Sequence, residues 1–166
     1  MSTRSSLEPQ KSGVAFLLAQ VGAHAAERFA ERLGPLKLTP AHAGILRAIH
    51  HAEGISQQAL AQHLGMFPSR MVLVLDEMGR LGLVERRPSA KDRRTYALHL
   101  TAGGQDKLEA IGRIAREHQE ALCAALNPGE RETLASLLSR IAEQQHLTAG
   151  VHPGYRKLGR GNEGSC

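Results

Sequence analysis

Two short helical segments joined at a glycine constrain this chain more than any other feature of its sequence. Residues 57–64 and 68–81 carry apolar side chains at helical spacing. Gly65 follows the first segment, and glycine is the residue type that most readily ends a helix in the left-handed conformation. Two helices joined by a turn of about three residues form a helix-turn-helix. The sequence therefore predicts a helix-turn-helix within residues 57–81.

The periodicity changes directly after the second of these helices. Residues 83–87 and 95–100 have the composition of strands, and the polar residues 88–93 between them are typical of a turn. Six basic and two acidic side chains lie between Arg80 and Arg94, which gives this stretch a net charge of +4. The sequence predicts a basic β-hairpin, the wing of a winged helix-turn-helix.

Helices are expected on both sides of this unit, so the expected fold class is mainly α with a small β-hairpin. Apolar spacing and caps such as Thr39 and Thr101 indicate where they begin. These helices are predicted at about residues 14–32, 40–51, 102–126 and 130–146. Residues 1–11 are polar and Ser-rich and are expected to be a disordered tail, and residues 148–166 a flexible one.

Composition limits the classes of protein that fit these 166 residues. Aromatic residues make up 3% and Trp is absent, so the core must be aliphatic. The net charge of +5 suits a polyanionic partner without identifying one. No apolar run approaches the roughly 18 residues of a membrane span, and residues 1–11 lack the apolar stretch of a signal peptide. We therefore expect a cytoplasmic protein without a membrane partner.

The expected wing carries the first candidates for DNA contact. A run of charges is more often solvated surface, but this one directly follows a helix-turn-helix. A hairpin tip is narrow enough to enter a minor groove, where arginine is favoured, which points to Arg93 and Arg94. Arg86 and Lys91 are expected to pair with phosphates. Asp92 either braces the tip by pairing with Arg94, leaving Arg93 as the groove contact, or is a plain turn residue.

The helix at residues 68–81 turns a second set of candidates away from its apolar stripe. These are Ser69, Arg70, Val72 and Leu73. In a major groove Arg70 would read guanine and the two apolar residues a thymine methyl, unless one of them packs against the wing. Asp76 and Glu77 would repel phosphate and are expected to point away from the DNA backbone.

These residues resemble the MarR family of winged helix-turn-helix transcriptional regulators over about residues 13–147. The resemblance rests on the start of the second helix and on the wing, where an Asp-Arg-Arg element precedes a Leu-Thr pair and a glycine. The matching residues are Leu64, Gly65, Pro68, Ser69, Gly82, Leu83, Val84, Glu85, Arg86, Arg87, Asp92, Arg93, Arg94, Leu98, Leu100, Thr101 and Gly104.

The resemblance implies a winged helix-turn-helix at about residues 38–101 and dimerisation helices at about 13–33 and 102–147. It also implies a homodimer that binds a pseudo-palindromic operator in double-stranded DNA, usually as a repressor. In many members a small, often phenolic, effector binds between the two parts and releases the DNA. The candidate ligand pocket includes residues near 114–118 and the side chains of His24, His42, Arg47, Phe67 and His118.

Some residues depart from the family's pattern. Phe67 stands where the family more often has a polar helix cap, so this helix start would use water or a neighbour, or Phe67 would line the pocket instead. The first helix has no cysteine, where peroxide-sensing members carry one, and Cys123 is expected to be a buried, inert thiol. No two histidines have the i, i+4 spacing of a helical metal site, so neither a metal nor a cofactor is expected.

Other function classes fit less well. An enzyme is disfavoured because the chain has no Gly-rich phosphate loop, no metal-ligand motif and no nucleophile with an obvious base. The remaining alternative is a nonspecific architectural DNA-binding protein. The first and last helices carry more apolar surface than a winged helix can cover, which independently favours a homodimer.

Overall fold

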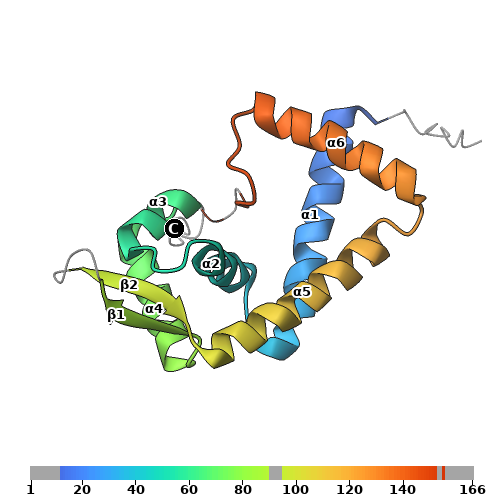
Figure 1. Cartoon of the computed structure of the whole chain (residues 1–166). Coiled ribbons are helices and arrows are strands. Elements are labelled where there is room, and N and C mark those ends of the chain that lie inside the picture. The colour runs from blue at the N-terminus through green and yellow to red at the C-terminus, as the bar shows by residue number, and fades with distance from the viewer. Residues whose placement is uncertain (1–11, 90–94, 153–154, 156–166) are drawn as a thin grey trace, which may run out of the picture.

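The computed structural model describes residues 12–89, 95–152 and 155. The expected disordered tail at residues 1–11 lies outside the described residues. The elements are α1 (Val14–Leu33), the short 3₁₀ helix η1 (Gly34–Leu36), α2 (Pro40–His51), α3 (Gln57–Leu64), α4 (Pro68–Arg80), β1 (Val84–Pro88), β2 (Tyr96–Leu100), α5 (Ala102–Leu122) and α6 (Pro128–Gln144). In Figure 1, α2, α3, α4 and the hairpin gather in one lobe, while α1, α5 and α6 extend away from it. The predicted fold class is confirmed.

The helix-turn-helix consists of α3 and α4, as predicted. The Ser56 hydroxyl accepts a hydrogen bond from the Ala59 N–H at 3.1 Å and so caps α3. Gly65 ends this helix with a φ of 63°, a conformation that glycine adopts without strain. α4 begins at Pro68, in the first turn, where the missing N–H would have had no helical partner.

The hairpin is antiparallel and runs from the pair Val84↔Leu100 to the pair Pro88↔Tyr96. Both strands begin one residue later than predicted, and β1 extends through Pro88. A further bridge joins Ser56 to the middle of β2, so the start of α3 lies against the hairpin.

Gly104 ties the hairpin to the first turn of α5. The Thr101 hydroxyl caps this helix by accepting from the Gly104 N–H at 3.0 Å. A Cβ at Gly104 would overlap the carbonyl oxygen of Leu83. The position requires glycine because helix and strand approach each other here through their backbones.

The turn between α5 and α6 differs from its prediction. α5 ends at Leu122 instead of about Leu126, and α6 begins at Pro128 instead of about Glu130. The reason is a reciprocal cap: the Asn127 side chain accepts from the Glu130 N–H at 2.9 Å, while the Glu130 carboxylate accepts from the Asn127 N–H at 2.8 Å. The residue that caps a helix is itself not helical, so α5 has to end before Asn127, and the residues after Leu122 form the turn.

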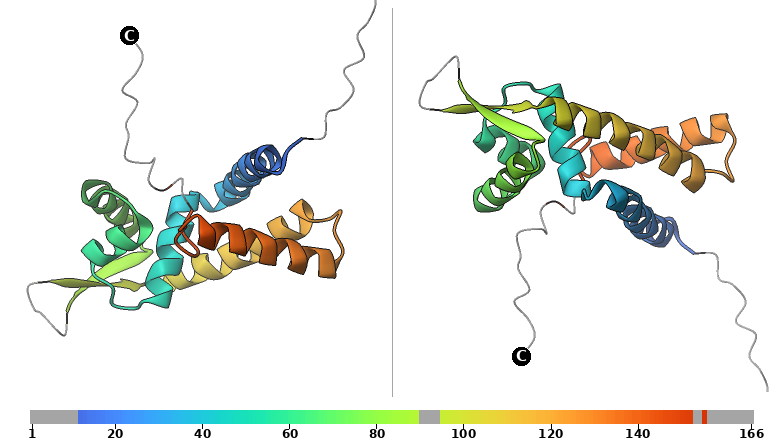
Figure 2. Two further views of the ribbon diagram at one scale, coloured as in Figure 1. Left: turned by 90° about the horizontal axis from the view of Figure 1, so that it is seen from above. Right: turned by 90° about the horizontal axis from the view of Figure 1, so that it is seen from below.

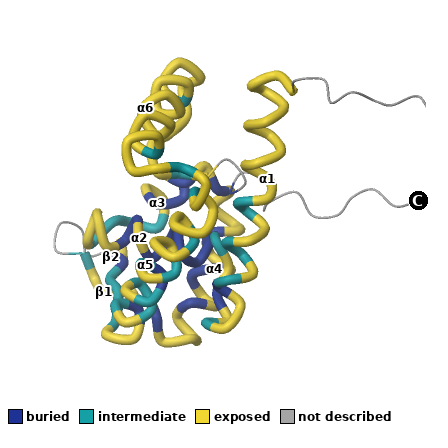
Figure 3. The backbone as a smooth tube through the Cα atoms, turned by 90° about the vertical axis from the view of Figure 1, so that its right-hand side faces the viewer, coloured by how far each residue is buried: buried dark blue, intermediate teal, exposed yellow. Residues whose placement is uncertain are grey.

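The core is aliphatic, as predicted, and lies in the helix-turn-helix lobe. The fully buried side chains are Leu33, Ile45, Leu46, Ile49, Leu60, Met71, Leu75, Met78 and Leu98. Figure 3 shows the contrast with α6 and the N-terminal half of α1, which are almost entirely exposed. Leu33 is the one buried residue of α1, and α6, which the structure describes in full, has none. No helix among the described residues is both long and apolar enough to cross a membrane.

The chain after α6 is not simply the flexible tail that was expected from residue 148. The described part, residues 148–152 and 155, returns to α2, and Tyr155 belongs to the core with 9% of its surface exposed. The composition of this segment suggested disorder. Composition cannot show that α2 provides a place for the tyrosine ring.

Candidate nucleic-acid interface and ligand cavity

The outer face of α4 is exposed as the sequence predicts. Met71, Val74, Leu75 and Met78 are buried on the opposite face. Ser69, Arg70, Val72 and Leu73 are all exposed. Leu73 exposes 61% of its surface, so the described part of the wing does not cover it. An exposed apolar residue beside an arginine suits the edges of base pairs in a major groove.

Phe67 occupies the N-cap of α4 but makes no side-chain cap hydrogen bond in the part of the chain that the structure describes. Its side chain is 58% exposed. Phe67 therefore does not cap the helix and is not among the residues that line the cavity described below. Its place in a ligand site stays a prediction.

Arg86 links three elements at the base of the wing. Its Nη2 atom donates to Asp76 Oδ1 on α4 at 2.8 Å and to Gln57 Oε1 on α3 at 3.2 Å. Its neighbour Arg87 pairs with Glu85 on the same strand. The sequence predicts a phosphate contact for Arg86. The structure gives Arg86 a second role, because its side chain holds α4 against the wing.

The tip of the wing is not described. Lys91, Asp92, Arg93 and Arg94, the strongest candidates from sequence, lie outside the described residues. The assignment of Arg93 to the groove and of Asp92 with Arg94 to a brace therefore stays a prediction.

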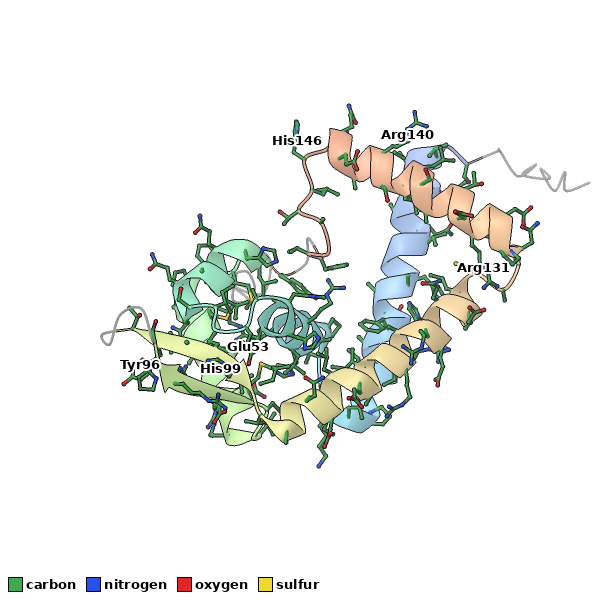
Figure 4. All side chains as sticks on the ribbon, in the orientation of Figure 1. Glu53, Tyr96, His99, Arg131, Arg140 and His146 are labelled. Carbon is green, nitrogen blue, oxygen red and sulfur yellow. The ribbon has the colours of Figure 1, made fainter. Side chains whose placement is uncertain are left out.

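Two further side-chain contacts join neighbouring segments. Figure 4 shows Glu53, at the end of α2, beside His99 of β2, and their Oε1 and Nδ1 atoms are 3.3 Å apart. At the far end, the Arg131 guanidinium donates to the carbonyls of Cys123 and Leu126 at 3.1 and 3.0 Å and so closes the turn before α6. Cys123 is half-buried at the C-cap of α5, where a place inside the helix was expected.

A cavity of about 450 Å³ lies between α1, α2, α4 and the C-terminal residues. Its lining consists of Ala26, Phe29, Thr39, Pro40, Ala41, His42, Arg47, Arg70, Val74, Glu77, Gly150, His152 and Tyr155. The volume lies in the usual range for small-molecule sites, and the lining combines an apolar majority with a few polar groups, as such sites do.

His42 is the buried polar group of this cavity. Its Nδ1 atom accepts from the Thr39 N–H at 3.1 Å, so the ring proton is on Nε2. That atom lies 3.6 Å from Glu77 Oε2 on α4. Glu77 points into the cavity toward α2, which agrees with the expectation that it avoids the DNA backbone.

Of the residues predicted for the pocket, only His42 and Arg47 line this cavity. His24 and His118 lie where α1 packs on α5. The His118 ring is 5.5 Å from the Phe29 ring. Burial lowers the pKa of His118, and the positive charges of Arg32, Arg28 and His24 lower it further. A role for His24 and His118 in a ligand site stays a prediction.

Sequence reasoning missed the contribution of the C-terminal residues. Tyr155 donates a hydrogen bond from its hydroxyl to the Pro40 carbonyl at 2.9 Å, and burial raises its pKa, partly offset by Arg47. One signal was present: Gly44 lies in the middle of α2, and a glycine inside a helix often marks a close approach.

Within the part of the chain that the structure describes, no group of three His, Cys, Asp or Glu side chains could hold a metal ion.

The winged helix-turn-helix and the exposed face of α4 define a DNA-binding protein. The family model that matches residues 36–95 is described as MarR family. The chain is 35% identical over 111 residues, 67% of each sequence, to a putative transcriptional regulatory protein for the hcr operon of Thauera aromatica. The chain belongs to the MarR family and is a DNA-binding transcriptional regulator.

Solved structures support the same assignment. Wild-type MarR from E. coli in its apo form matches with a TM-score of 0.71 and 26% identity, over 80% of this chain and 98% of that one. The transcriptional repressor CouR, bound to a 23-mer DNA duplex, matches with a TM-score of 0.70 and 30% identity, over 78% of this chain and 92% of that one. These relatives are transcription regulators and not enzymes.

Proposed function

We propose that a homodimer of this chain represses transcription from a pseudo-palindromic operator. The observation that carries the proposal is the exposed face formed by Ser69, Arg70, Val72 and Leu73 in the N-terminal half of α4. This half would lie in the major groove, and the wing would reach the adjacent minor groove. The likeness to CouR, a repressor solved on DNA, supports the direction of regulation. The regulator would act in the cytoplasm, where its operator is.

The proposed dimer rests on two apolar faces. On α1, Phe16 is 60% exposed and Val21 50%, and on α6, Leu137 is 47% exposed and Ile141 41%. Figure 2 shows that α6 and the N-terminal part of α1 extend away from the helix-turn-helix lobe, so that lobe does not cover these side chains. Faces of this kind are expected to be buried against a second copy.

The proposed effector is a small molecule, of the phenolic kind that the family resemblance implies, bound in the cavity between α2 and α4. Arg70 supports this because it belongs both to the cavity lining and to the exposed face of α4. A ligand that draws the Arg70 guanidinium into the cavity removes it from the DNA. Binding of ligand and operator would then oppose each other, as reciprocity of the two affinities requires.

The test compares operator and random DNA. For a palindrome from the upstream region of the protein's own gene, we expect an affinity about a thousandfold or more above that for random DNA of equal length. Fluorescence anisotropy at fixed salt measures both. A ratio near one would show nonspecific architectural binding and contradict the proposal.

Two variants separate the contributions of helix and wing. Arg70→Ala should relax the preference for one or two base pairs, because a base contact is lost. Arg93→Ala combined with Arg94→Ala should weaken binding to all sequences and flatten the dependence on salt, because phosphate and groove contacts are lost. Unchanged affinity in the double variant would show that the wing tip does not contact DNA.

A further inference from the structure

The described residues after α6 are held against α2 by two contacts. The Arg47 guanidinium donates to the Gly150 carbonyl, and the Tyr155 hydroxyl donates to the Pro40 carbonyl. Val151 packs against the edge of the core between them. These contacts join residues that are more than one hundred positions apart in the sequence, so they define a specific place for the segment.

Gly44 provides the space in which the Tyr155 ring lies. A Cβ at Gly44 would lie 2.5 Å from the Tyr155 hydroxyl oxygen and 2.8 Å from two ring carbons. A glycine in the interior of a helix is less favourable than alanine by about 1 kcal/mol. At Gly44, this unfavourable choice makes room for an aromatic side chain from the far end of the chain.

The segment separates two hollows along α2. Gly150, His152 and Tyr155 form one side of the cavity of about 450 Å³ that contains His42. Ala149 and Gly150 line a second hollow of about 510 Å³ on the other side, toward α3. Arg47 and Gly150 belong to both linings.

We propose that residues 148–152 and Tyr155 form a fixed wall of the ligand cavity, and that Tyr155 and Arg47 determine which ligands fit. This inference rests on the proposed effector function. The wall adds the Tyr155 ring to the apolar lining of the cavity. The Arg47 guanidinium, whose Nη2 atom donates to Gly150, lies at the edge of the wall with further N–H groups for an acidic group. We expect the ligand to be an aromatic molecule with one anionic group. Its size is limited because the Tyr155 ring is held against Gly44 and closes one side of the cavity.

The first test asks whether Tyr155 is seated in solution. The chain has no Trp and two Tyr residues, so in a Tyr96→Phe background Tyr155 is the single emitter of intrinsic fluorescence. We expect acrylamide to quench Tyr155 several-fold less than free N-acetyltyrosinamide. Gly44→Ala should raise quenching close to that of the free compound. Gly112→Ala is the matched control, because a Cβ at that helical glycine meets only the end of the Arg116 side chain at 3.7 Å. Quenching of Tyr155 like the free compound in the parent chain would overturn the proposal.

The second test asks whether the seated segment is a wall. Anilinonaphthalene sulfonate, an aromatic anion, is titrated into the full chain, a chain ending at Leu147, and Tyr155→Ala. We expect both changed chains to bind it about tenfold more weakly, equivalent to about 1.4 kcal/mol, and Gly44→Ala to have no further effect in the shortened chain. Equal or stronger binding by the shortened chain, or no binding by the full chain, would overturn the wall.

Operator binding by the same chains distinguishes this inference from the proposed function. Neither the exposed face of α4 nor the wing contains Tyr155, so Tyr155→Ala should bind operator as the full chain does. If the shortened chain binds anilinonaphthalene sulfonate as well as the full chain does, while the full chain still prefers operator DNA, the wall is contradicted and the proposed function is not. If the full chain does not prefer operator over random DNA, the proposed function fails on its own evidence.

Discussion

At the scale of single residues, the Asp76–Arg86 pair shows how an acidic group on a DNA-binding helix can assist binding. Both side chains are partly exposed, at 50% and 35%, so the pair adds little to the free energy of unfolding. Its effect is geometric: Arg86 also reaches Gln57, and the three side chains hold α4, α3 and β1 in one arrangement.

The direction in which Asp76→Ala changes DNA affinity tests this geometric role. Loss of a negative charge near phosphate should strengthen DNA binding if charge alone acts. We expect the opposite, a loss of operator affinity of about fivefold or about 1 kcal/mol, because Arg86 is released and the wing loses its place beside α4. Anisotropy titrations and thermal melts of the same samples measure affinity and stability.

Glu85→Ala is the matched control for charge. Glu85 pairs with Arg87 on β1, and among the described residues its side chain has no ion pair with α4. Its removal should leave operator affinity unchanged or slightly stronger. If Asp76→Ala and Glu85→Ala both strengthen binding equally, Asp76 does not position the wing.

The local features of the site could be predicted from sequence, and the cavity could not. The buried and exposed faces of α4 follow from helical spacing, which is visible within residues 68–81. The place of Tyr155 depends on Gly44 and Pro40, and no local pattern joins positions so far apart. Phe67 was given a pocket role because a phenylalanine cannot cap a helix, and the sequence alone does not show which way its side chain points.

At the scale of elements, helix starts were predicted better than helix ends. Thr39 and Thr101 identify starts because a cap acts within four residues. The end of α5 was placed too late because residues 123–126 continue its apolar composition. The competing cap at Asn127 ends that continuity, and its strength depends on the reciprocal bond with Glu130.

The packing of α1 on α5 is the element contact that should respond to pH. The pKa of His118 is lowered by burial first and then by Arg32, Arg28 and His24. A folded-state pKa below the unfolded value means that the unfolded chain binds the proton more readily. Stability is therefore fully present above the unfolded pKa of about 6.5 and falls as the pH drops through the folded pKa.

Melting temperatures of the wild-type chain and His118→Phe across that window measure the effect. Phenylalanine keeps the ring against Phe29 and cannot take up a proton. We expect the wild type to lose more stability than the variant on acidification, by a small amount because His118 is only partly buried. Parallel pH profiles for the two chains would show that His118 does not contribute.

At the scale of the whole molecule, the uneven burial argues for a second copy. The helix-turn-helix lobe contains nearly all buried side chains, while α1 and α6 expose apolar rows that include Leu17, Leu18, Leu134 and Leu138. A lobe with its own core can fold around α4, but one recognition helix reads one half-site. Two lobes on a two-fold axis would place their recognition helices roughly 34 Å apart, one turn of DNA.

Leu137→Glu should convert the dimer to a monomer, because it puts a charge into the apolar face of α6. Leu81→Glu is the matched control: leucine is 49% exposed there and 47% exposed at Leu137, but Leu81 follows α4 and lies outside the apolar rows. Sedimentation equilibrium at micromolar concentration should give a dimer mass for the wild type and the control and a monomer mass for Leu137→Glu.

The monomer should also lose most of its operator affinity, since the two half-sites are then bound independently and the second no longer benefits from a high effective concentration. A monomer mass for the wild type would contradict the dimer, and a dimer mass for Leu137→Glu would show that α6 does not form its interface.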